Sequence, residues 1–119
     1  MVGPHKNLVV WQKAMAFVTE LYHCTGHFPK SEQFGLTDQL RRASISIVSN
    51  IAEGYGRSTN SDLLHFLHMS LGSSNEIDSQ LEVACNLGYL SSEEYSKFDE
   101  MNEEINRMLR SLIYKRINY

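Results

Sequence analysis

The chain has 119 residues, of which 42% are hydrophobic and 21% charged, and its formal net charge is -3 at pH 7. This length and composition are typical of a single soluble domain, and the acidic balance disfavours a generic nucleic-acid binder. No apolar run reaches membrane-spanning length, and the starting residues MVGPHKN lack the hydrophobic region of a signal peptide. We therefore expect a cytoplasmic protein with no membrane partner, in which Cys24 and Cys85 remain reduced.

The charges are distributed unevenly along the chain. Residues 1–59 carry six Lys/Arg and four Asp/Glu, residues 60–106 carry one and ten, and residues 107–119 carry four and none. A helix with acids near its start and bases near its end complements the helix dipole, which explains the last two segments without any ligand. A binding site for a polyanion is the alternative interpretation of the basic tail.

The first expected helix covers residues 8–27. Val10, Ala14, Phe17, Leu21 and Cys24 recur at spacings of four and three, which is the period of an amphipathic helix. They are flanked by further apolar residues, namely Trp11, Met15, Val18 and Tyr22. Pro29 then prevents continuation, and PKSEQFG forms a connector.

The second expected helix covers residues 36–54, with Thr37 as a candidate cap. The segment SISIVSNIAEGYGR alternates briefly like a strand, but the helical period persists for about five turns and therefore decides the assignment. The apolar side consists of Leu36, Leu40, Ala43, Ile47 and Ile51. Gly54 and Gly56 are expected to stop the helix.

The third and fourth helices are expected over residues 61–87 and 92–117. Asn60 or Ser61 is the expected cap of the third helix, Gly88 its end, and its small residues Gly72, Ser73 and Ser74 would let another backbone approach closely. The third seam is Leu64, Leu67, Leu71, Ser74, Ile77, Leu81 and Ala84, and the fourth is Phe98, Met101, Ile105, Met108 and Leu112, joined by Leu109, Ile113 and Ile117. Ser91 with Glu94 fits a capping box for the fourth helix. Since the connections are short, we predict one all-α domain over residues 1–119, an antiparallel up-and-down four-helix bundle.

No motif in the chain indicates catalysis. GYGRST lacks the Lys of a phosphate-binding loop and follows no strand, so it is interpreted as a helix stop. His23 with His27, and His65 with His68, have spacings that can place two imidazoles on one face, but no Glu-x-x-His pair completes a ligand set. Cys24 beside His23 does not face it on a helix, because adjacent residues diverge by about 100°. We expect no enzyme, no cofactor and no metal site, with a metal-dependent or thiol enzyme as the weakest hypothesis.

A polar stripe on the second helix is the strongest candidate for function. Short side chains separate its charged members, which would permit close packing against another helix or subunit, whereas an ordinary solvated face carries longer charged residues. A solvated face remains the alternative. The candidate residues for a subunit interface or polar seam are Arg42, Ser46, Ser49, Asn50 and Glu53.

Three stretches of the chain resemble one family. They are LVVWQKA at residues 8–14, FPKSEQFGLTDQLRRA at 28–43 and SISIVSNIAEGYGRS at 44–58, followed by FLHMSLGSSNEIDSQLEVACNLGYL at 66–90. The sequence resembles the four-helix-bundle proteins encoded within 23S ribosomal RNA intervening sequences. Arg41, Arg42, Asn50, Glu53, Gly54 and Arg57 match the family signature, whereas Val48 stands where the family often has proline.

The resemblance implies an antiparallel four-helix bundle that assembles into a homopentameric ring and has no known enzymatic activity. Related accessory proteins of diversity-generating retroelements bind nucleic acid, but they are strongly basic and this chain is not. We therefore expect a homo-oligomeric scaffold that interacts with a protein or RNA partner. The alternative is a factor that binds structured RNA, for which the candidate contacts are Arg41, Arg57, Arg107, Arg110, Lys115 and Arg116.

Overall fold

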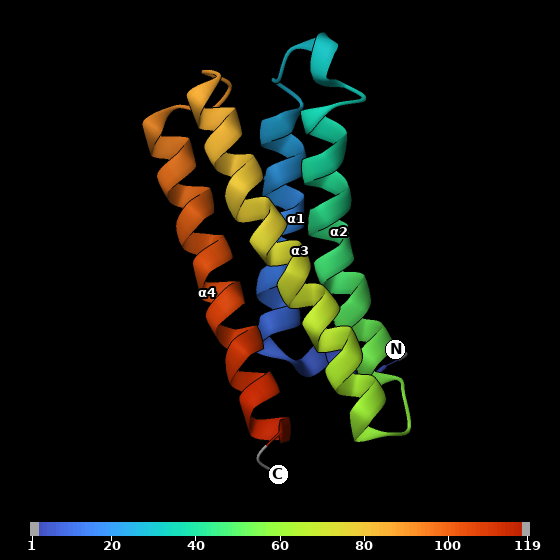
Figure 1. Cartoon of the computed structure of the whole chain (residues 1–119). Coiled ribbons are helices and arrows are strands. Elements are labelled where there is room, and N and C mark those ends of the chain that lie inside the picture. The colour runs from blue at the N-terminus through green and yellow to red at the C-terminus, as the bar shows by residue number, and fades with distance from the viewer. Residues whose placement is uncertain (1–2, 118–119) are drawn as a thin grey trace.

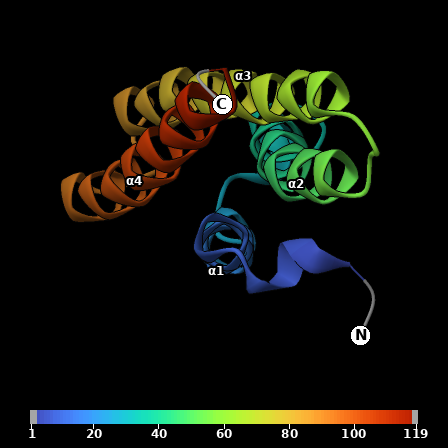
Figure 2. The same ribbon diagram turned by 90° about the horizontal axis from the view of Figure 1, so that it is seen from below.

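The computed structural model describes residues 3–117, which form four α-helices and no strand (Figure 1). The α-helices are α1 (Val9–Thr25), α2 (Leu36–Tyr55), α3 (Asn60–Asn86) and α4 (Ser92–Ile117), and the short 3-10 turns are η1 (Pro4–Asn7) and η2 (Lys30–Glu32). Consecutive helices run in opposite directions, and α2 lies between α1 and α3 (Figures 1 and 2). The prediction of an all-α fold with four helices is confirmed.

The caps of α2 and α3 differ from the predicted ones. Thr37 is buried in the first turn of α2, and the helix start is capped instead by the Glu32 carboxylate, which accepts a hydrogen bond from the Leu36 N–H at 3.0 Å. At α3, Thr59 Oγ1 accepts the Asp62 N–H at 3.1 Å, so Asn60 is the first helical residue rather than the cap. Both predictions were wrong because several cap-forming residues stand close together, and the sequence does not show which one lies at the helix boundary.

The predicted start of α4 and the predicted end of α3 are both present. Ser91 Oγ accepts the Glu94 N–H, and Glu94 Oε1 accepts the Ser91 N–H, which completes the capping box of α4. After α3, Gly88 has a φ of 80°, and the following Tyr89 N–H donates to the Ala84 carbonyl at 2.9 Å. A left-handed backbone conformation at this position favours glycine and ends the helix.

One apolar core runs through all four helices. The predicted residues Val10, Ala14, Phe17 and Leu21 of α1 are buried, as are all five residues predicted for the apolar side of α2. In α3, Leu63 and Ser70 are buried, while the predicted Leu64 and Leu71 are only half-buried at the edge. Phe17 and Phe98 meet edge to face in this core, with ring centroids 5.8 Å apart.

Small residues bring α2 and α3 close together. Ser70 Oγ donates to the Ile47 carbonyl at 2.9 Å, and Ser73 Oγ donates to Ser46 Oγ at 2.8 Å. The predicted close approach is therefore correct at Ser73. Ser74 contacts Asn102 of α4 instead, and Gly72 faces outward, where a Cβ would meet nothing within 4 Å.

Gly54 has a different role from the predicted one. It does not stop α2, which continues to Tyr55, but is buried against α3. A Cβ on Gly54 would lie 3.0 Å from Phe66 Cβ and 3.1 Å from Leu63 Cδ1. Gly56 follows the helix with a φ of -89°, so it caps the helix without using the left-handed region.

The seam of α4 also differs from the predicted one. Phe98, Ile105, Leu109 and Ile113 are buried as expected, and Asn102 is buried although it was not predicted. Met101, Met108 and Leu112 lie at the edge, and Ile117 is exposed. The missed Asn102 satisfies its amide on α3. Its Oδ1 accepts from Ser74 Oγ at 2.9 Å, and its Nδ2 donates to the Ser74 carbonyl at 3.0 Å. A buried amide with partners of this kind costs little, which is why a polar residue can occupy a core position.

Gly54→Ala should lower the free energy of unfolding by about 1–3 kcal/mol, because the new methyl group overpacks the contact between α2 and α3. Urea unfolding followed by circular dichroism measures the effect. Gly56→Ala is the matched control, since its Cβ would make only ordinary contacts, 3.5 Å from the Glu53 oxygen and 3.6 Å from the Ala52 oxygen. Equal stability of the two variants would contradict a packing role for Gly54.

Candidate functional site: assembly surfaces and basic residues

The fold divides the predicted polar stripe of α2 between two environments. Ser46 and Asn50 are half-buried on the α3 side of the helix, where Ser46 Oγ accepts a hydrogen bond from Ser73 Oγ of α3. Asn50 Nδ2 donates to the Ser46 carbonyl and to Ser46 Oγ, both at 2.9 Å. Arg42, Ser49 and Glu53 are exposed on the outer side of the helix. Part of the stripe is thus a seam within one subunit, and the exposed part remains available to another molecule.

The two exposed charges of the stripe already have partners one turn away. Arg42 Nε lies 2.9 Å from Asp38 Oδ2, and Glu53 Oε2 lies 3.7 Å from Arg57 Nη2. Exposed pairs at this spacing contribute only a few tenths of a kcal/mol. They leave the outer side of α2 nearly neutral without strongly fixing its side chains.

Arg41 stabilises the end of α1. Its Nε donates to Thr25 Oγ1 at 2.9 Å, its Nη2 donates to the Tyr22 carbonyl at 3.1 Å, and its guanidinium carbon lies 4.5 Å from the centre of the Tyr22 ring. A cation that binds a carbonyl of the last turn complements the helix dipole. This arrangement joins α1 to α2 at the end of the bundle opposite to Arg57.

Arg57 and Arg116 lie at the other end and line a shared hollow of about 220 Å³ between the ends of α2 and α4 and the start of α3. The Arg57 guanidinium carbon lies 4.9 Å from the centre of the Phe66 ring, and that of Arg116 lies 5.9 Å from the centre of the Tyr55 ring. Asn60 Nδ2 donates to the Arg116 carbonyl at 3.2 Å and connects the two helix ends. Two of the predicted nucleic-acid contacts are therefore brought together although they are 59 positions apart in the sequence.

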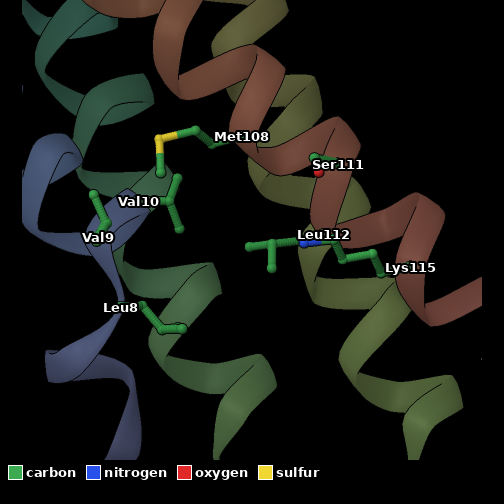
Figure 3. A pocket seen from close by; sticks show the side chains of 7 residues that line it. All are labelled: Leu8, Val9, Val10, Met108, Ser111, Leu112 and Lys115. Atoms are coloured by element: carbon green, nitrogen blue, oxygen red, sulfur yellow. The ribbon is translucent and has the colours of Figure 1, made fainter.

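The remaining predicted basic contacts are spread along α4. Arg110 donates from Nε to Asn106 Oδ1 at 2.9 Å and lies 3.6 Å from Glu103, while Arg107 is exposed. Lys115 lines a separate hollow of about 260 Å³ between the start of α1 and the end of α4. Val10, Met108 and Leu112 point into that apolar space (Figure 3). The structure therefore does not gather the six predicted contacts into one patch.

Histidine and cysteine meet in a hollow of about 350 Å³ between the end of α1 and the start of α4. His23, Cys24 and His27 line it together with Glu20 and Glu94. The Cys24 thiol donates to Glu94 Oε2 at 3.6 Å. Burial, followed by the Glu94 charge, raises the pKa of the Cys24 thiol to about 11. The thiol is therefore protonated at neutral pH, which makes it a poor nucleophile.

Residues 3–117 contain no group of three or more side chains arranged to hold a metal ion.

Five carboxylates gather along the outer side of α3 and α4. Burial raises the pKa of Asp99, and the charges of Asp78, Glu103, Glu100 and Glu82 raise it further. A raised carboxyl pKa means that the folded state favours the protonated form, so this repulsion weakens the fold at neutral pH and is relieved as the pH falls. Five of the ten acids of residues 60–106 thus share one surface.

Two further features were not predicted from the sequence. The first is the hollow shared by Arg57 and Arg116, for which the sequence contains no signal, because residues distant in the chain form it. The second is the exposure of large apolar residues on several helices, including Met15, Ile45 and Val83. For α1 the sequence did indicate this exposure, because apolar residues such as Met15 flank the core side of its helical pattern.

Within the described residues, none of the helices combines the length and the apolar character needed to cross a membrane.

Glu94→Gln should speed alkylation of Cys24 by iodoacetamide at pH 8 severalfold, because it removes the charge that helps to keep the thiol protonated while retaining an oxygen for the cap. Peptide mass spectrometry measures the rate, with Cys85 as the internal reference. The matched control is Glu93→Gln on the adjacent exposed residue. An unchanged rate in Glu94→Gln would show that burial alone controls this thiol.

Comparisons with known proteins agree with this architecture. A crystal structure from Bacteroides thetaiotaomicron, described as a protein of unknown function from the S23 ribosomal protein family, is 27% identical with a TM-score of 0.80. The match covers 88% of this chain and 98% of that one. No curated protein matches the chain. The family model of the 23S rRNA-intervening sequence protein matches residues 6–111, and the chain therefore belongs to that family.

Proposed function

We propose that this protein is a non-enzymatic, homo-oligomeric helical-bundle scaffold that interacts with a protein or RNA partner. The observation that carries the proposal is the exposure of large apolar side chains on α1, α2 and α3, in a bundle whose core is already filled by other residues. Exposed apolar residues that gather on one surface are typical of protein interfaces. A small domain also gains stability when such a surface is covered by another subunit.

The hollows of the structure support a binding role over catalysis. The hollow beside Cys24 holds a thiol with a raised pKa, the opposite of the lowered pKa that activates a nucleophile. The hollow between α1 and α4 is lined mainly by aliphatic side chains. For the assembly itself, we propose the ring of five subunits implied by the family resemblance, with Arg42, Ser49 and Glu53 exposed close to its subunit contacts.

Light scattering during size-exclusion chromatography should give a mass well above the 13.7 kDa of one chain, and five times that mass for the proposed ring. Simultaneous absorbance at 260 and 280 nm shows whether nucleic acid copurifies. A mass of one chain at micromolar concentration would contradict the scaffold proposal. A different multiple would keep the scaffold and exclude five subunits.

The alternative function is binding of structured RNA, and the hollow shared by Arg57 and Arg116 is the observation that favours it. Arginine is suited to phosphate because its planar group donates two parallel hydrogen bonds, and Ser58 and Thr59 also line the hollow. Several copies of this end in one assembly would multiply a local positive charge that the net charge of -3 conceals.

Replacing Arg57 and Arg116 together by Glu should weaken binding of a structured RNA by at least about tenfold at low salt, because the phosphate contacts would be lost. Fluorescence anisotropy over a salt series measures the affinity and its salt dependence. Lys30→Glu is the control, since Lys30 belongs to η2, in the connection between α1 and α2 at the opposite end of the bundle (Figure 1). Failure of the wild-type protein to bind at low salt would reject this alternative.

A further inference from the structure

The side of the bundle where α1 meets α2 carries a ridge of exposed and half-buried residues. Its α1 residues are Trp11, Met15, Val18 and Tyr22. They follow one another at spacings of four and three, which places them on the side of α1 that faces α2. The contact of Arg41 with Tyr22 sets the antiparallel register, so Ile45 comes beside Val18, one turn further along each helix. The α1/α2 ridge consists of Trp11, Met15, Val18, Tyr22, Arg41 and Ile45.

The composition of the α1/α2 ridge is that of an interface core. Met15 is 38% exposed and Ile45 40% exposed, values high for aliphatic side chains in the middle of long helices. Aromatic residues, Met and Arg are enriched at the centres of protein interfaces, whereas Lys and Glu are depleted there. The ridge contains neither Lys nor any acid, and it runs for about 17 Å along α1.

A second surface lies along α3, beside its contact with α2. Residues at spacings of three and four form a row next to Ser73, which contacts Ser46 of α2. Met69 is 44% exposed and Val83 46% exposed, and between them the row has Gly72, Glu76 and Ser79. The α3 stripe consists of Met69, Gly72, Glu76, Ser79, Val83 and Leu87. It extends for about 27 Å, so it is long enough to cover the ridge.

The two surfaces match in apolar character and in charge. The α1/α2 ridge exposes Met15, Tyr22 and Ile45, and the α3 stripe exposes Met69, Val83 and Leu87. The ridge has one cation, Arg41, and no acid, whereas the stripe has one acid, Glu76, and no cation. Arg41 donates two hydrogen bonds within its own chain, one from Nε and one from Nη2. A guanidinium has five N–H donors in total, so it can also donate to a carboxylate of another copy.

We infer that the α1/α2 ridge of one copy of this chain docks on the α3 stripe of the next copy, with Arg41 facing Glu76 across the contact. The inference rests on the proposed homo-oligomeric function and specifies its subunit interface. Matching charges and apolar surfaces on one chain are the reason for naming a second copy as the occupant, rather than an unrelated protein.

The position of the two surfaces also determines the kind of assembly. α2 lies between α1, which carries most of the ridge, and α3, which carries the stripe (Figure 2). Contacts between two different surfaces are head-to-tail, and they form rings when successive copies turn and filaments when the rotation does not close. The ring proposed above is the closed form of such a head-to-tail contact.

The test uses variants at exposed positions that the fold tolerates. Ile45→Glu blocks the ridge, and Val83→Glu blocks the stripe. Each should reduce the mass measured by light scattering from that of the oligomer to 13.7 kDa. Val9→Glu is the matched control, since Val9 is 53% exposed on α1 but lies at the α4 side. It should keep the wild-type mass, and circular dichroism should show unchanged helix content in all three variants.

Mixing the two blocked variants decides between a head-to-tail contact and other contacts. Each variant retains one intact surface, so an equal mixture should form a dimer of one Ile45→Glu and one Val83→Glu chain and grow no further. A mixture that stays monomeric would overturn the proposed pairing. An oligomer that survives both substitutions would overturn the interface but leave the scaffold function intact, whereas a monomeric wild-type protein would refute both.

Discussion

The close approach of α2 and α3 is the constraint on which the remaining surfaces depend. Ser70 and Ser73 donate hydrogen bonds across this seam, and a Cβ on Gly54 would lie only 3.0 Å from Phe66 Cβ and 3.1 Å from Leu63 Cδ1. Helices in contact through small residues cannot rotate about their axes without losing these bonds. The seam therefore fixes which residues of α2 point outward, and with them the places of the α1/α2 ridge and the α3 stripe.

A second polar contact aligns α4 with α3. Asn102 is buried, and its amide both accepts from and donates to Ser74, while Asn106 Nδ2 donates to Ser74 Oγ at 3.0 Å. A shift of one helix by a turn would leave this amide unpaired in the core, at a cost of about 1–3 kcal/mol. Apolar side chains would tolerate such a shift more easily. We therefore attribute the register of the two longest helices to this pair, and their cohesion to the surrounding Leu and Ile residues.

Hydrophobic periodicity predicts the four helices and most of the core, since burial repeats with the helical period. It fails where a polar or small residue is buried for a reason outside its own helix. Asn102 was missed because its partner, Ser74, is 28 positions away, and Gly54 was assigned to a helix end because glycine usually has that role. The sequence also indicated the polar stripe of α2, but it could not show which stripe residues face α3 and which are exposed. Only the position of α3 separates Ser46 and Asn50, which face it, from the exposed Arg42, Ser49 and Glu53.

The proposed assembly connects the two candidate functions. In a closed ring built from one repeated head-to-tail contact, every copy points the same way along the ring axis. The end of the bundle that carries Arg57 and Arg116 would then be repeated on one face of the ring, while the acidic surface around Asp99 would be repeated along the sides of α3 and α4. Local charge, rather than the net charge of -3, determines attraction to a phosphate backbone over a Debye length of about 8 Å. An acidic chain can therefore present a basic ring face, and binding to RNA would depend on assembly.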